Sequence, residues 1–188
     1  MKGIEVSNSS VPSLPESLRE VGTLSIRRTG LTSIPENLKE IRENLNISFL
    51  PTFSLPNGLT VGGNLGLLDV GLTSLPENLT VNGDFSMSMV GITSLPENLK
   101  INGDFIVDKK FTSIPDSVEI GGNILLDDGK GPYKQMDSLS DLIDNGENER
   151  VEYEDIDALI ERVSKMNEHE IPSTNLAIDE MENDDLEL

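Results

Sequence analysis

An apolar residue followed by proline recurs through the first two thirds of this 188-residue chain. The successive prolines of these pairs are 20, 21, 20, 20 and 19 residues apart. A fixed period of this length is typical of repeat architectures, in which each unit buries its apolar face against its neighbours. The chain is therefore predicted to form a solenoid. The six pairs are Leu14-Pro15, Ile34-Pro35, Leu55-Pro56, Leu75-Pro76, Leu95-Pro96 and Ile114-Pro115.

Each repeat contains two short stretches of alternating polarity. In the clearest unit these are Leu79-Thr-Val81 and Phe85-Ser-Met87, with Asn82-Gly83-Asp84 between them. Alternation at period two predicts strands with one buried face. Glycine between the strands gives the backbone the freedom that a tight corner needs, and proline, which donates no ladder hydrogen bond, belongs at another corner. One repeat therefore traces one coil of a β-solenoid.

Stacking of the coils predicts two interior columns and one polar ladder. The first column is Leu24, Leu45, Leu65, Phe85, Phe105 and Ile124. The second column is Ile26, Ile47, Leu67, Met87, Val107 and Leu126. The ladder, just before the second strand of each coil, is Asn44, Asn64, Asp84, Asp104 and Asn123. Gly3–Val6 matches Thr23–Ile26, so the pattern extends to six and a half coils within residues 1–130.

On this pattern the unit resembles the short leucine-rich repeats of about 20 residues found in bacterial effector and bacteriophage proteins, which share the Leu-Pro corner. The resemblance covers residues 3–129. It departs from the common pattern because Thr29, Val70 and Val90 stand where a ladder of Asn is usual. We therefore expect a more fully β coil than the strand-plus-helix horseshoe. The resemblance implies protein–protein recognition as the function.

The repeat stops after residue 130, and the composition changes. Apolar residues at helical spacing predict short helices at 137–143 and 154–167. We expect residues 131–171 to form a helical cap on the stack, and residues 172–188 to form an acidic, flexible tail. The expected fold class is mainly β, a leucine-rich-repeat-like β-solenoid with a small C-terminal α-helical cap and an acidic tail.

The charge of the chain is uneven. Its net charge is −20, and residues 131–188 carry 18 acidic and only 4 basic side chains. Such a field repels nucleic acids and anionic membranes and favours a partner protein with a basic surface. The sequence has no cysteine, no membrane-spanning apolar run and no apolar signal core at its start. We therefore expect a cytoplasmic location, in a bacterium or an infected host cell.

The candidate catalytic and metal sites in the sequence are weak. Asp84 and Asp104 lie on adjacent coils and would be close enough for glycoside chemistry, but a corner ladder that binds the backbone explains them better. A calcium-binding loop could start at Asp141 or at Asp144, but each lacks one essential residue. In the first loop Ile143 occupies a ligand position, and in the second Glu149 stands where the turn needs glycine. We therefore predict no enzymatic activity, no metal and no cofactor.

The sequence favours a non-catalytic protein-binding module. An inhibitor or adaptor of a host protein would act through the solenoid flank and the acidic C-terminal region. A DNA mimic and a self-assembling structural component are the alternatives. Ile4 and Val6, on an uncapped first coil, are candidates for an edge or homodimer contact. The candidate partner-binding residues are Glu147, Glu149, Glu152, Glu154, Asp157, Glu161, Asp179, Glu180, Asp184 and Asp185.

Overall fold

The computed structural model of this chain describes residues 2–128 and 132–143. These residues form a β-solenoid of about six turns, as the repeat predicts. Two parallel sheets run along it, and each coil contributes one strand to each sheet. Within the described ranges the structure contains no helix that could span a lipid bilayer. The second helix predicted at 154–167 and the tail at 172–188 lie outside the described residues.

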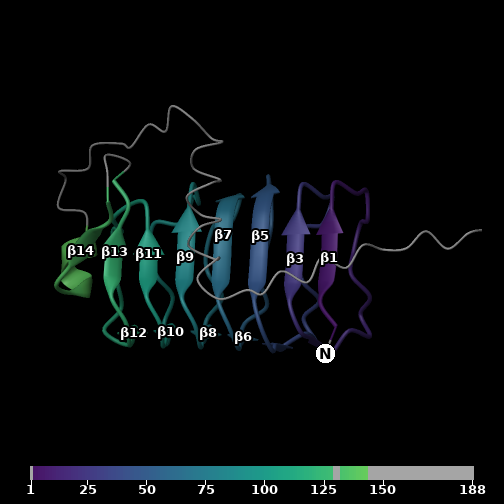
Figure 1. Ribbon diagram of the computed structural model, residues 1–188, viewed down its shortest axis with the longest axis horizontal. Coiled ribbons are helices and arrows are strands. Elements are labelled where there is room, and N and C mark those ends of the chain that lie inside the picture. The colour runs from purple at the N-terminus through teal and green to yellow at the C-terminus, as the bar shows by residue number, and fades with distance from the viewer. Residues whose placement is uncertain (1, 129–131, 144–188) are drawn as a thin grey trace, which may run out of the picture. The chain divides into compact units, whose positions relative to one another are not determined.

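The larger sheet, sheet A, contains the second strand of every coil in sequence order (Figure 1). Its first seven strands are parallel, with Leu24, Leu45 and Leu65 in register. The interior column predicted from the repeat is therefore a column of the sheet. These strands are β1 (Ile4–Ser7), β3 (Leu24–Arg27), β5 (Leu45–Leu50), β7 (Leu65–Val70), β9 (Phe85–Ser88), β11 (Phe105–Val107) and β13 (Ile124–Leu126).

The smaller sheet, sheet B, contains the first strand of each coil and is also parallel. Every strand is two residues long, and the second residue of the pair faces inward. A one-turn coil leaves little room for longer strands, because the chain must also form three corners within about 20 residues. The strands are β2 (Glu20–Val21), β4 (Glu40–Ile41), β6 (Thr60–Val61), β8 (Thr80–Val81), β10 (Lys100–Ile101) and β12 (Glu119–Ile120).

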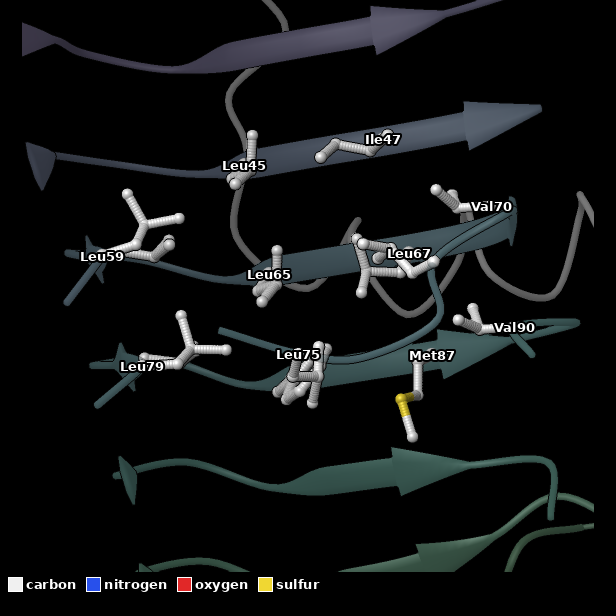
Figure 2. Close-up of a cluster of buried hydrophobic side chains, with 14 of the residues drawn as sticks. Leu45, Ile47, Leu59, Leu65, Leu67, Val70, Leu75, Leu79, Met87 and Val90 are labelled. Atoms are coloured by element: carbon white, nitrogen blue, oxygen red, sulfur yellow. The ribbon is translucent and has the colours of Figure 1, made fainter. Parts of the chain in front are cut away.

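The core lies between the two sheets and runs the length of the described solenoid. The first interior column is at most 9% exposed in the six coils from Leu24 to Ile124. The second column is buried as far as Val107 and half-buried at Leu126. Figure 2 shows Leu45 and Ile47 on one strand and Leu65 and Leu67 on the next. Because each such side chain contributes roughly 2 kcal/mol when buried, adjacent coils stabilise one another strongly.

The corner that leads into the sheet A strands from β7 to β13 is built from glycine and the polar ladder. We call it the glycine corner (Gly63, Gly83, Gly103 and Gly122). A Cβ at Gly83 would lie less than 3.0 Å from Asn64 Oδ1 and from the Gly63 carbonyl carbon. Asn64 Oδ1 instead accepts a hydrogen bond from the Asp84 backbone N–H at 2.8 Å. Glycine is therefore required here by the close approach of successive coils.

The two ends of the described solenoid differ. At one end β1 pairs only with β3. At the other, β14 (Lys134–Met136) pairs antiparallel with β13, and a 3-10 helix, η1 (Leu139–Leu142), follows. Leu142 is fully buried, and its carbonyl accepts a hydrogen bond from Phe111 N–H at 2.7 Å. The helix predicted at 137–143 is present in part as the 3-10 helix η1, whereas β14 was not predicted.

Candidate binding surface

A second kind of corner lies at the C-terminal ends of the sheet A strands. From β1 to β9, one residue near the end of each strand has a left-handed backbone, and we call these positions the exit corner. Between β5 and β7 the ladder pairs Ser48 with Leu68 and Leu50 with Val70, and it skips the residues in between. This interruption turns the chain out of the sheet. The exit-corner residues are Asn8, Arg28, Phe49, Asp69 and Met89, with φ of 46°, 48°, 57°, 51° and 55°.

The residue types at the exit corner are unusual for this conformation. A left-handed backbone costs roughly 1–2 kcal/mol for most L-residues, and Gly, Asn and Asp adopt it most readily. Where the same solenoid needs a left-handed residue after the Leu-Pro pair, it uses Gly58, Asn78 and Asn98. At the exit corner it instead places an arginine, a phenylalanine and a methionine. The exit corner therefore combines a strained backbone with large side chains.

A pocket of about 360 Å³ opens at the exit corner of three successive coils. This volume lies at the lower end of the range for ligand pockets, roughly 300–1,000 Å³. The pocket walls include Phe49, Asp69 and Met89, together with Leu50, Val70 and Gly71 from the segments just beyond. Figure 2 shows Val70 at the end of its strand and Val90 in the equivalent place one coil away. Among the described residues that line the pocket, most are apolar and Asp69 is the one charged residue.

The aromatic wall of the pocket is engaged by two arginines of the preceding coil. The guanidinium carbons of Arg28 and Arg27 lie 4.6 and 5.2 Å from the centroid of the Phe49 ring. Cation–π contacts at exposed sites contribute about 0.5–1 kcal/mol each. They hold the Phe49 ring in place, so this wall is preorganised.

The methionine wall is held by a half-buried carboxylate. Asp108 Oδ2 accepts hydrogen bonds from the Met89 backbone N–H at 2.6 Å and from Ser88 Oγ at 3.1 Å. Burial raises the pKa of Asp108 above its ordinary value of 3.8, and these hydrogen bonds and Lys109 oppose the shift. Burial lowers the pKa of Lys109, whose Nζ donates to the Val90 carbonyl. The pair fixes the backbone on both sides of the Met89–Val90 peptide.

The residues that the sequence analysis singled out fall into three groups: the edge residues of β1, the paired aspartates and the acidic residues of the C-terminal region. Ile4 and Val6 are half-buried on β1, paired with Leu24 and Ile26 of β3. Asp84 Oδ1 accepts a hydrogen bond from the Asp104 backbone N–H at 2.9 Å, which confirms the ladder interpretation of these carboxylates. The ten acidic residues from Glu147 to Asp185 lie outside the described residues.

Sequence reasoning missed the exit corner. Its positions follow a strand in each repeat, but arginine, phenylalanine and methionine carry no signal for a left-handed backbone. Only Asn8 and Asp69 are residue types that suggest one. Val70 and Val90, which stand where the usual repeat has an Asn ladder, directly follow the exit-corner residues Asp69 and Met89. This departure from the usual repeat does not by itself indicate a pocket. The site depends on which side chains successive coils bring together, and the repeat pattern treats these positions as variable.

Comparison with protein-family models, with curated proteins and with solved structures found no match to this chain. Within the described residues, no group of three or more His, Asp or Glu side chains is arranged to hold a metal ion.

Proposed function

We propose that this chain is a non-catalytic protein-binding module and that the exit corner is its principal binding surface. The observation that carries the proposal is the presence of strained, large side chains around a pocket. Phe49 and Met89 hold left-handed backbones where glycine or asparagine would cost less. The residue types of the Leu-Pro corner would form the same turn at a lower backbone cost, so the turn alone does not require these side chains.

Contacts within the solenoid hold the binding surface, which lowers the entropic cost of association. Ladder pairs lie on both sides of Phe49 and Asp69. Arg27, Arg28 and Asp108 contact the walls. The acidic C-terminal region would add a charged contact and speed association with a basic partner. The resemblance to effector and bacteriophage repeats suggests that the partner is a host protein, for which the module is an inhibitor or adaptor.

Affinity capture from a bacterial lysate tests the proposal. The immobilised full chain is compared with a Phe49→Gly/Met89→Gly variant and with Glu40→Lys, which reverses an exposed charge on strand β4 of sheet B. We expect a protein that the wild type and Glu40→Lys retain and the double variant loses. Equal retention by all three, or no retention by any, would contradict the proposal. Neutralising Asp179, Glu180, Asp184 and Asp185 measures the added contribution of the C-terminal acids.

The DNA-mimic alternative has one supporting observation. An acidic residue follows the apolar-Pro pair in five coils, and all five are exposed. Asn57 takes this place in the remaining coil and bonds the next one, accepting from the Glu77 backbone N–H at 3.0 Å. Coils about 4.8 Å apart would align the carboxylates in a row. Release of the captured protein by duplex DNA would favour this alternative. The five residues are Glu16, Glu36, Glu77, Glu97 and Asp116.

Self-assembly is supported by the edge of β1. Ile4 N–H donates to the Thr23 carbonyl at 2.8 Å and Asn8 N–H donates to the Arg27 carbonyl at 3.0 Å, so Glu5 and Ser7 direct their backbone groups to the opposite side. Within the described residues no strand pairs with that side. A second copy of the chain would extend the sheet there. Sedimentation equilibrium of the wild type and of Ser7→Pro tests this: a dimer that the substitution dissociates is the expected result, and a wild-type monomer contradicts it.

A further inference from the structure

The exit-corner pocket combines an apolar wall on each side with one carboxylate between them. Ser48 pairs with Leu68, and Leu68 pairs with Ser88, so the residues that follow them, Phe49, Asp69 and Met89, lie on three successive coils. Asp69 is exposed. Within the part of the chain that the structure describes, its carboxylate forms no ion pair. The pocket therefore presents an uncompensated negative charge between an aromatic ring and a thioether.

From this arrangement we infer that the pocket binds a lysine or arginine side chain of the partner protein, with an apolar residue beside it. Such side chains have an apolar stem and a cationic end, and they bury the stem while the end keeps a polar partner. Phe49 and Met89 would contact the stem, and Asp69 would pair with the cationic end. The inference deepens the proposed function, on which it rests, by naming the chemistry of the partner.

The charges around the pocket favour this occupant. The phenylalanine ring at the wall already binds guanidinium groups, those of Arg27 and Arg28. Those two arginines would repel a second cation, but Asp69 lies between the Phe49 and Met89 coils and lines the pocket itself, whereas neither arginine does. At longer range the net charge of −20 attracts basic segments. An acidic or purely apolar segment would gain nothing from Asp69, and it would leave the carboxylate desolvated.

Selection from a random dodecapeptide library tests the inference. The bait is the full-length chain, as wild type, Asp69→Asn, Asp69→Lys or Glu40→Lys. Glu40→Lys is the matched control, because it reverses an exposed acidic residue on sheet B, away from the pocket at the ends of the sheet A strands. We expect the wild type and the control to select peptides with Lys or Arg next to an apolar residue. Asp69→Lys should lose these peptides.

A synthetic peptide from the selection then gives the affinities. Asp69→Asn should weaken binding about tenfold, which is typical for loss of a hydrogen bond to a charged group. Asp69→Lys should weaken it more, and Glu40→Lys should change it less than about twofold. Three outcomes overturn the inference: wild-type peptides without a basic residue, equal binding to all four chains, or no selected peptide.

Failure of the inference can be told apart from failure of the proposed function. Peptides that lack a basic residue but lose binding to Phe49→Gly/Met89→Gly would leave the exit corner as a binding surface and remove only the assigned partner chemistry. Binding that survives the double variant would remove the exit corner itself.

Discussion

The glycine corner and the exit corner, which both flank β7 and β9, turn the chain with opposite residue types. At the glycine corner a Cβ has no space, because Asn64 Oδ1 and the preceding coil occupy it. At the exit corner the backbone is left-handed, which favours glycine, and yet Phe49 and Met89 stand there. Packing therefore dictates the first corner. The second departs from what packing alone would choose, and such departures are expected at functional sites.

The largest effect should come from adding one methyl group at the glycine corner. In Gly83→Ala the new Cβ would collide with Asn64 Oδ1 and with the Gly63 backbone, which cannot move without breaking the ladder. We expect a loss of about 3 kcal/mol in the free energy of unfolding, measured by urea denaturation. Gly58→Ala is the control: it meets no atom within 4 Å but has φ of +70°. It should cost only about 1 kcal/mol.

Removing a side chain of the polar ladder should lower the free energy of unfolding by less than Gly83→Ala does, and the two effects should be coupled. Asn64→Ala leaves the Asp84 backbone N–H without its acceptor, and the expected loss is about 1–2 kcal/mol. The same change removes one of the atoms that collide with a Cβ at position 83. The Asn64→Ala/Gly83→Ala variant should therefore lose less stability than the two single losses added together. Strict additivity would show that the two residues do not share one packing constraint.

The next effect concerns pH at the exit corner. The pKa of Asp108 is raised above 3.8 by burial, so its ionised form destabilises the fold at neutral pH. The contribution of Asp108 to the free energy of unfolding becomes more favourable as pH falls through the raised pKa. This gain in stability is complete once the pH is below 3.8. At pH 7 the free energy of unfolding of Asp108→Asn should equal that of the wild type or exceed it by less than about 1 kcal/mol. That advantage should shrink towards pH 4. An advantage that grows on acidification would contradict the direction of the shift.

Much of the fold could be predicted from the sequence, because the features that define it repeat. The Leu-Pro spacing gives the coil, the alternation around Val81 and Met87 gives the two strands, and Asn64 and Asp84 belong to a ladder that the structure confirms. Outside the repeat, the helix predicted at 137–143 is present in part as η1, but β14 was missed. Strand β14 lies outside the pattern and is not strongly apolar. It pairs with β13 and so covers the edge that β13 would otherwise leave open.

The candidate site could not be predicted for a related reason. A repeat identifies positions that all coils share, whereas the pocket comes from three different residues at one position, Phe49, Asp69 and Met89. Their left-handed backbones follow from the corner and not from their own preferences. The acidic partner-binding residues predicted from Glu147 onward remain a prediction, since they lie outside the described residues.

Urea unfolding of the Phe49→Gly/Met89→Gly variant tests most directly whether the exit corner carries side chains that the fold does not need. Relief of about 1–2 kcal/mol at each left-handed residue should offset the lost apolar and cation–π contacts. We predict a free energy of unfolding within about 1 kcal/mol of the wild type. A loss of about 3 kcal/mol or more, as expected for Gly83→Ala, would show that these side chains are structural and would contradict the account.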